Sequence, residues 1–416
     1  MRGKHLLAAG ISCGACVLAL LFLLYGYANT WKLWNIPVNL PCFADLRVIT
    51  HGMESYALGY DPLLRNPQDP WERPMNYPRI WLLLHVTGVN RDHTVVLGVA
   101  LIALFVASQF LYTHRELDPR AAGLLTLMLF SPAVLFCIER GNLDLLMFSI
   151  LSLAIFIRNT RFNLSRVLSM ALVFTAFFLK LFPIFGFGIL LREKRRIFMR
   201  LGLFVLAVGL LYIAFTYDDL IQIRRDTPRS PDVSYGVWVL SSKVARVSPV
   251  LGEVTCLLSY VAAAGVALAV ILGFREKEVP AQSSHEMALD AYRAGSGIYI
   301  GTFLLGHNFD YRLIFLLFTI PQLAEWLRSP NHHVALLVKV VVIAVLLSMW
   351  HLLIVKLFHA LPGIGPADFV LDEFAHWAIF FGMAYLLSFS APDWMKELVG
   401  RLWHQRSPEE PHTTTG

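Results

Sequence analysis

The amino-acid sequence predicts an all-α polytopic membrane protein, with about eleven transmembrane helices. The chain has 416 residues, of which 56% are apolar and only 15% are charged, whereas a soluble protein carries about 25% charged residues. Long apolar runs at 6–27, 94–112, 254–274 and 334–355 reach the length of about 20 residues that crosses a bilayer. Short basic clusters lie between the runs, as the positive-inside rule describes for cytoplasmic loops.

The apolar runs predict a topology in which both termini are cytoplasmic. Arg2 and Lys4 place the start of the first run in the cytoplasm, and this run is too long for a cleaved signal peptide, so we interpret it as a retained helix. Residues 28–93 then form a long first extracytoplasmic loop, whose end at 79–89 is apolar but too short to span. Further crossings are expected at 94–112, 121–138, 145–157, 167–191, 198–215, 254–274, 298–305, 313–327, 334–355 and 374–389, with a second extracytoplasmic loop at 217–250.

The run at 167–191 is expected to be broken. It contains the charged Lys180 and the helix-breaking Pro183, and both of its flanks are basic, so it enters and leaves the membrane as two half-helices. Broken helices at membrane depth are tolerated where they line a polar cavity. Residues 1–391 are expected to form one transmembrane domain, followed by a partly disordered cytoplasmic tail at 392–416.

Composition and motifs exclude several classes of function. The net charge of +6 is divided among short loop clusters instead of forming a basic stripe with interleaved aromatics, which argues against nucleic-acid binding. The one C-x-x-C, at Cys13 and Cys16, lies in an apolar helix, where it serves packing and not redox chemistry. The sequence contains no Walker A loop, no G-x-G-x-x-G in a βαβ unit and no H-E-x-x-H.

The energetically costly polar residues gather at the extracytoplasmic ends of the predicted helices. They are Asp45, Arg47, Tyr77, Arg140, Asn142, Asp144, Lys180, His307, Asn308, Asp310, Tyr311 and Arg312. Ionisable residues at membrane depth usually pair with one another or serve a site. Their convergence predicts a polar cavity that opens outward between broken helices, and the excess of Arg, Lys and His indicates an anionic ligand.

Several of these residues also have purely structural interpretations, which the sequence leaves open. Arg140 could pair with a neighbouring carboxylate and cap its turn, and Lys180 could extend along its helix to the membrane interface. Structural roles are equally open for an ion pair of Asp310 with Arg312, a helix end at His307 and Asn308, a loop cap formed by Asp218 and Asp219, and a pair of Asp45 with Arg47.

Four segments together resemble a known family. "FADLRVITHGMESYALGYDPL" at 43–63 resembles the D-[FLW]-x-V…G-x-[DP]-x-Y pattern in the first outer loop of C-type polytopic glycosyltransferases. The nearest branch is glycosyltransferase family 87, which includes polyprenyl-phosphate-mannose-dependent mannosyltransferases. "NYPRIWLLL", "ERGNLDLLMFSILSLAIF" and "FFLKLFPI" resemble its Y-P-P, R-G-N-[IL]-D and K-x-[YF]-P segments in order, with a weaker similarity at "HNFDYRLIFLL". The chain departs from the pattern at Arg79, where a second proline is usual, and at Leu63, where a tyrosine often stands.

The resemblance implies an inverting transferase. It would move a hexose or pentose, with a mannose-like sugar favoured, from a polyprenyl phosphate to a hydroxyl of a lipid-linked or cell-envelope glycan. Asp45 would be the general base, a role that typically contributes about 10²–10⁴-fold. Cations would stabilise the leaving phosphate, and the candidates are Arg140, Lys180, His307 and Arg312. The substrate-binding candidates are Arg47, Tyr77, Trp81, Asn142, Asp144, Asn308, Asp310 and Tyr311.

No metal or other cofactor is expected, although Asp218, Asp219 or Asp310 could complete a divalent metal site. The sequence lacks the D-x-D with which many soluble sugar transferases hold a metal and a nucleotide-sugar, so the donor would come from the membrane. The expected location is the cell (inner or plasma) membrane, with the site on the extracytoplasmic face. Two competing functions are a transporter or flippase of lipid-linked sugars and a non-catalytic scaffold. The one-sided distribution of charge and the lack of an internal repeat favour the transferase over the transporter.

Overall fold

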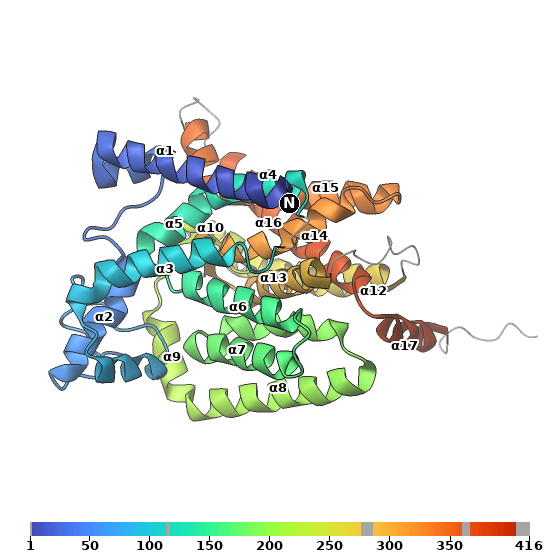
Figure 1. Ribbon diagram of the computed structural model, residues 1–416, viewed down its shortest axis with the longest axis horizontal. Coiled ribbons are helices and arrows are strands. Elements are labelled where there is room, and N and C mark those ends of the chain that lie inside the picture. Colours follow the sequence, from blue (N-terminus) through green and yellow to red (C-terminus); the bar gives the residue numbers. More distant parts are fainter. Residues whose placement is uncertain (1, 114–116, 276–285, 360–366, 405–416) are drawn as a thin grey trace, which may run out of the picture.

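The computed structural model describes residues 2–113, 117–275, 286–359 and 367–404, and it is almost entirely helical (Figure 1). The α-helices are α1 (Arg2–Leu33), α2 (Ala44–Ala57), α3 (Thr94–Ser108), α4 (Pro119–Leu129), α5 (Pro132–Arg140), α6 (Asp144–Arg158), α7 (Ser165–Leu179), α8 (Arg195–Phe215), α9 (Tyr217–Asp226), α10 (Val239–Ala245), α11 (Pro249–Ala264), α12 (Val266–Arg275), α13 (Glu286–Leu305), α14 (Ile320–Trp326), α15 (His332–His359), α16 (Ala367–Phe389) and α17 (Asp393–His404). The 3₁₀ helices are η1 (Arg79–Thr87), η2 (Arg91–His93), η3 (Phe182–Arg192), η4 (Pro231–Val233) and η5 (Asp310–Thr319).

Six stretches of the described chain are long and apolar enough to cross a membrane. They are Arg2–Leu33, Arg91–Ser108, Arg195–Phe215, Pro249–Arg275, His332–His359 and Phe369–Phe389, and α4 with α5 adds a seventh if that pair, bent by 51°, is one span. This confirms the predicted all-α, membrane-embedded class. The outward faces of these helices carry large apolar side chains, such as Leu23 in α1 and Val96 in α3, as expected where hydrocarbon is the solvent.

The other predicted crossings coincide with shorter or interrupted helices, so the count of eleven stays a prediction. The helices α6 and α7 have 15 residues each, and η3 has 11. An apolar run in the sequence does not distinguish a span exposed to lipid from a shorter segment that is apolar because protein surrounds it. Much of η5 belongs to the second kind, because Leu313–Thr319 are all buried.

The break predicted within 167–191 is present. Helix α7 ends at Leu179, Lys180 adopts an extended conformation (φ −162°, ψ 114°), and η3 begins at Phe182 with Pro183 in its first turn. The Trp81 indole of η1 donates a hydrogen bond to the Leu179 carbonyl over 3.0 Å, which satisfies a carbonyl that the end of the helix leaves without an intrahelical partner. The break therefore carries Lys180 out of the helix and into the interior of the protein.

Three other segments differ from the sequence interpretation. The first predicted outer loop contains three helical pieces, α2, η1 and η2. The stretch before the crossing predicted at 298–305 is helical from Glu286 onward, and α13 there buries Asp290 against Arg192 of η3. Helix α17 occupies the start of the predicted tail, and its Trp394 indole donates to the Glu193 carbonyl. The rest of the tail, 405–416, lies outside the described residues.

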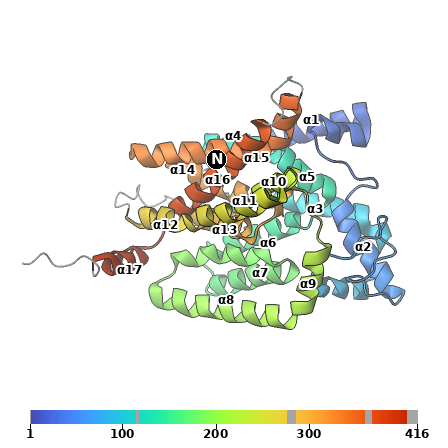
Figure 2. The same cartoon turned by 180° about the vertical axis from the view of Figure 1, so that it is seen from behind.

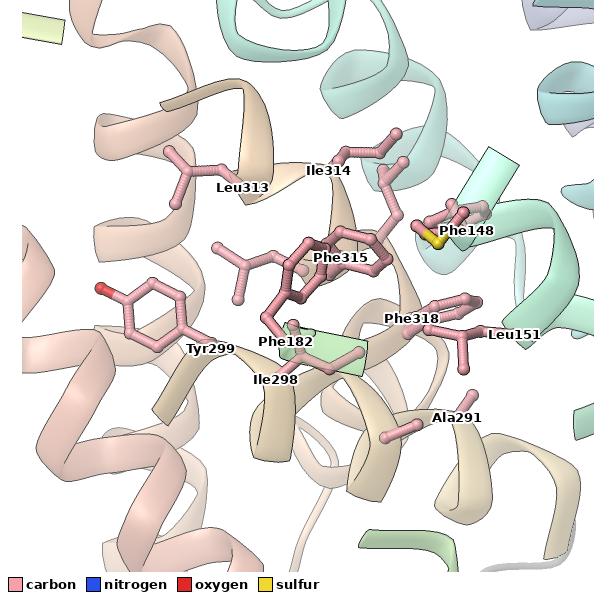
Figure 3. Close-up of a cluster of buried hydrophobic side chains, with 14 of the residues drawn as sticks. Phe148, Leu151, Phe182, Ala291, Ile298, Tyr299, Leu313, Ile314, Phe315 and Phe318 are labelled. Carbon is pink, nitrogen blue, oxygen red and sulfur yellow. The ribbon is translucent and has the colours of Figure 1, made fainter. Parts of the chain in front are cut away.

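The core is centred on packed aromatic rings from helices far apart in the sequence. Figure 3 shows Phe148, Phe315 and Phe318 converging, with Phe182 beside them. The rings of Phe148 and Phe318 are stacked, with centroids 4.1 Å apart, and Phe182 meets Phe315 edge-on at 5.2 Å. Helix α13 packs against η3 and η5, so the core holds together the segments that carry Lys180 and Arg312.

A two-residue ladder fixes the connection between α13 and η5. Strand β1 (Ser234–Tyr235) pairs antiparallel with β2 (Asn308–Phe309), and Tyr235 lies opposite Asn308. Gly236, at φ +130°, follows β1, and a Cβ there would lie 2.2 Å from the Gly306 carbonyl oxygen. The two backbones approach closely only because this position lacks a side chain.

The stacked core predicts the effect of Phe148→Ala. Deleting a buried phenyl ring leaves a cavity, and the typical cost for Phe→Ala is about 3–5 kcal/mol. We expect the melting temperature of the purified protein in detergent to fall by several degrees. Phe156→Ala on the same helix is the matched control, because Phe156 is 40% exposed and its loss should change stability little. Equal melting temperatures for the two variants would contradict the assigned core.

Candidate functional site

Asp45 lies in the first turn of α2. Phe43, which precedes the helix, is in the left-handed conformation (φ 60°, ψ 46°) and leaves the first turn without a side-chain cap. A carboxylate in the first turn is stabilised by the partial positive charge of the helix N-terminus. The Asp45 side chain is partly exposed, whereas its neighbours Ala44 and Leu46 are buried. The helix therefore presents one carboxylate between two buried apolar side chains.

A tight turn after α5 brings the next polar group to Asp45. Gly141 ends α5 in the left-handed conformation, at φ +58°, and a Cβ there would lie 2.8 Å from the Cβ of Phe43. The turn projects Asn142, whose amide nitrogen donates to Oδ2 of Asp45 over 2.6 Å. Within the described part of the chain, this is the hydrogen bond that holds the Asp45 side chain. A neutral amide, and not a cation, therefore positions the carboxylate.

Asp144 is the buried counter-ion of the site. It is 0% exposed, and its oxygens accept from Nζ of Lys180 at 2.5 Å and from Nε of Arg312 at 3.4 Å. Lys180 also donates to Oδ1 of Asn142 at 2.9 Å. Arg312 also donates, through Nη1, to Oδ1 of Asn308 at 2.5 Å. The result is a continuous network that joins the ends of α2, α5, α6, α7 and η5.

Aromatic rings support the two cations. The guanidinium of Arg312 lies 4.3 Å from the centre of the Phe182 ring, and Nζ of Lys180 lies 5.3 Å from that of Tyr77. The face of an aromatic ring attracts a cation, and this attraction is stronger where water is excluded. Tyr77 is itself buried, and burial raises the pKa of its hydroxyl well above its ordinary value. It therefore remains a neutral group beside the network.

Three adjoining cavities surround this network, and all three are lined by Thr227 and Tyr311. The first, of about 330 Å³, is lined by Asp45, Arg140, Asn39 and Asn76, among others. The second, of about 560 Å³, is lined by Arg224, Arg229, Trp238, His307, Asn308 and Arg312, among others. The third, of about 210 Å³, is lined by Tyr77, Lys180, Phe182, Leu220 and Arg312, among others. Most of the predicted site residues thus line one of these three cavities.

Arg140, Arg47 and Trp81 have partners of their own. Arg140 pairs with Glu139 at 3.4 Å and donates to the Pro37 carbonyl, yet it also lines the first cavity. Arg47 donates to the Cys42 carbonyl at 2.8 Å and contacts His51, so within the described residues no ion pair joins it to Asp45. Trp81 supports the end of α7 through its bond to Leu179, and it lies outside the three cavities.

His307 and Asp310 lie on either side of β2, which contains Asn308. Burial shifts the pKa of both side chains. Burial lowers the pKa of His307 to about 4, so its imidazole is neutral at neutral pH and donates or accepts hydrogen bonds only. Burial raises the pKa of Asp310 to about 8. The ion pair of Asp310 with Arg312, one interpretation that the sequence leaves open, does not form, because Arg312 pairs with Asp144.

The sequence interpretation missed two groups of residues. Arg224 and Arg229 line the second cavity from the segment after α8, and Asp372 contacts His351 and His376 between α15 and α16. The basic stretch "IRRDTPR" signals the first group, but its placement over the cavity depends on the fold. For the second group, the spacing of Asp372 and His376 on one helix face is the available signal.

The described residues hold no cluster of three or more His, Cys, Asp or Glu arranged for a metal. Of the carboxylates considered for a metal, Asp219 accepts two hydrogen bonds from Arg79, at 2.9 and 3.0 Å. Asp310, the first residue of η5, is buried. The expectation of a site without a metal stays a prediction.

Comparisons with known proteins returned no match. No family model, curated protein or solved structure is similar to this chain at a significant level. The interpretation of the site therefore depends on its own geometry.

The buried position of Asp144 predicts a large effect of Asp144→Asn. Removing one partner of a buried pair leaves uncompensated charge and costs about 3–5 kcal/mol, here with two cations affected. We expect a marked loss of thermal stability in detergent. The double variant Asp144→Asn/Lys180→Met should recover part of it, because one unpaired cation is gone. Asp218→Asn, at an exposed position of α9, is the control; an Asp144→Asn protein as stable as this control would refute the counter-ion role.

The turn at Gly141 predicts that Gly141→Ala is destabilising. The left-handed conformation costs a residue with a Cβ about 1 kcal/mol, and the close contact with Phe43 adds to this. Gly123→Ala is the matched control, because nothing lies within 4 Å of a Cβ placed there in α4. We expect Gly123→Ala to be neutral or stabilising in a thermal melt and Gly141→Ala to lower the melting temperature. The opposite order would show that the turn is not constrained.

Proposed function

We propose that this protein is an integral membrane glycosyltransferase that uses a sugar carried on a polyprenyl phosphate. The observation that supports this most is the Asp45 carboxylate. It is partly exposed, it lies on the wall of a cavity of about 330 Å³, and within the described residues it is held by the neutral Asn142 amide and not by an ion pair. A carboxylate in this setting is available to accept a proton from a substrate.

The orientation of α6 supports an extracytoplasmic site. Its first residue, Asp144, belongs to the network, and its last residue, Arg158, pairs with Glu193 at the other end. Arg158 belongs to the basic clusters that the positive-inside rule assigns to the cytoplasm. In Figures 1 and 2, α2 and α9 lie at one end of the molecule and α17 at the other. We infer that the end with α2 and α9 faces outward, that the cavities open there, and that about eleven membrane passes support them.

The proposed reaction is a single displacement at the anomeric carbon of the donor sugar. The acceptor hydroxyl attacks this carbon while Asp45 takes its proton. The bond between the anomeric carbon and the phosphate oxygen breaks, and its electron pair leaves with the polyprenyl phosphate. A new glycosidic bond forms with inversion. Negative charge grows on the leaving phosphate, so fixed cations and hydrogen-bond donors near it stabilise the transition state.

The surroundings of the cavities support a lipid-linked donor. The third cavity combines Lys180 with the apolar side chains of Leu181, Leu220, Ile223 and Leu305, so a phosphate and a hydrocarbon chain could lie side by side. Near the second cavity, the neutral His307 imidazole can contribute one hydrogen bond to a phosphate oxygen, and its Nε2 is buried without a hydrogen-bond partner in the described chain. The transferred sugar is proposed to be a hexose or pentose, with mannose the first to test, and the acceptor a hydroxyl of a lipid-linked or cell-envelope glycan.

The proposal predicts that Asp45→Asn abolishes transfer. A neutral amide cannot accept the proton, so the rate should fall by about 10²–10⁴-fold, while the melting temperature and the affinity for the donor stay close to those of the wild type. The measurement is the formation of radiolabelled product from polyprenyl-phosphate sugars by the purified protein in detergent. Asp92→Asn is the matched control, because Asp92 is an exposed acid of the same predicted loop.

Two outcomes would overturn the proposal in different ways. Normal turnover by Asp45→Asn would remove the general-base assignment. Movement of the lipid-linked sugar across vesicles that contain the protein, without any glycosidic product, would favour a transporter or flippase.

A further inference from the structure

The segment between α8 and α10 crosses the three cavities and is fixed at several points. At its start, Asp219 of α9 binds Arg79, which also binds Asp61 at 3.0 Å. Further on, Asp232 binds Arg246 at 2.9 Å, and β1 pairs with β2. We call residues 217–238 the strap. Because these contacts fix the strap on both sides of the cavities, the side chains that line the cavities from the strap are held in place.

The strap supplies two cations to the second cavity. Arg224 and Arg229 both line it, together with Arg312, and its lining contains no Asp or Glu. The guanidinium of Arg224 lies 5.7 Å from the centre of the Trp238 ring, and the Trp238 indole is itself held by a hydrogen bond to the Tyr260 hydroxyl. The ring therefore provides a fixed platform for Arg224.

Arg224 and Arg229 have no counter-ions in the described part of the chain. The nearby carboxylates of the strap are engaged elsewhere: Asp219 and Asp232 bind arginines outside the strap, and Asp226 accepts from Gln222 at 2.7 Å and lines the first cavity, not the second. Arg312 differs from these two arginines, because it forms an ion pair with Asp144. The unpaired cations that line the second cavity thus come from the strap.

We propose that Arg224 and Arg229 form a binding site for the phosphate of a lipid phosphate ester. Guanidinium groups bind phosphate through paired, charge-assisted hydrogen bonds, and a cavity of about 560 Å³ has room for this group. Leu304 and Leu305 line the same cavity and are 43% and 58% exposed, so a hydrocarbon chain attached to the phosphate can leave along them toward the bilayer. The site deepens the proposed function, on which it rests for the identity of the lipid as the sugar donor.

The test measures binding, independently of turnover. Citronellyl phosphate, a short polyprenyl phosphate, is titrated into the full-length protein in nanodiscs, and citronellol and inorganic phosphate are titrated in parallel. Loss of a charge-assisted contact should weaken binding by about tenfold, which corresponds to about 1.4 kcal/mol. We expect this for Arg224→Gln and for Arg229→Gln, with citronellol bound weakly by all variants.

Arg225→Gln is the matched control. Arg225 lies on the same helix as Arg224 and is exposed, but it does not line any of the three cavities. Its replacement should leave the Kd for citronellyl phosphate unchanged within about twofold. If Arg224→Gln and Arg229→Gln also match the wild type, the anion site is wrong. If inorganic phosphate binds as tightly as citronellyl phosphate, the ligand is a soluble anion and the lipid assignment is wrong.

The outcome is distinguishable from that of the proposed function. Binding of citronellyl phosphate that depends on Arg224 and Arg229, without transfer from any polyprenyl-phosphate sugar, would retain the site and remove the transferase. Transfer that persists with unchanged donor KM in both variants would retain the transferase and remove the site.

Discussion

The structure of the polar end depends on one interaction, the buried Asp144 carboxylate between Lys180 and Arg312. Burying an isolated carboxylate or ammonium group in an apolar environment is very costly, so these groups must lie together. Their meeting requires α6 to begin, α7 to end and η5 to start at one place. The aromatic core brings the same segments together through apolar contacts, because Phe182 contacts both Arg312 of the network and Phe315 of the core. The network therefore positions Asn142, and through it Asp45.

The cations at this end of the protein are of two kinds, those that pair with a carboxylate and those that do not. Lys180 and Arg312 both pair with Asp144, and Arg140 pairs with Glu139. A cation that already binds a buried carboxylate attracts an additional anion less strongly than an unpaired cation does. Arg224 and Arg229 have no such carboxylate partner in the described chain. Phosphate binding by the strap would therefore leave the Asp144 network intact, whereas binding by Lys180 alone would have to compete with Asp144 for the same ammonium group.

The sequence is sufficient to predict the helical membrane class, the break at Lys180 and the polar residues that meet at one end. These features depend on local signals, namely apolar runs, a proline beside a charge, and ionisable residues at helix ends. The partners of those residues are less predictable. Asp310 lies only two positions from Arg312, yet Arg312 binds Asp144, which is 168 positions away. Such pairings are decided by how the helices pack, and a single sequence contains no local signal for them.

The strap is a second example of a feature that the sequence alone does not predict. The strap contains three arginines, Arg224, Arg225 and Arg229, and the sequence gives no sign of which of them line a cavity. Only the fold distinguishes them, because α9 turns Arg224 toward Trp238 and the cavity while Arg225 lines none of the three cavities. The placement of α9 is supported in turn by Arg79, which binds Asp219. A proline at position 79 could not form this ion pair, so the residue at this position and the position of the strap are physically linked.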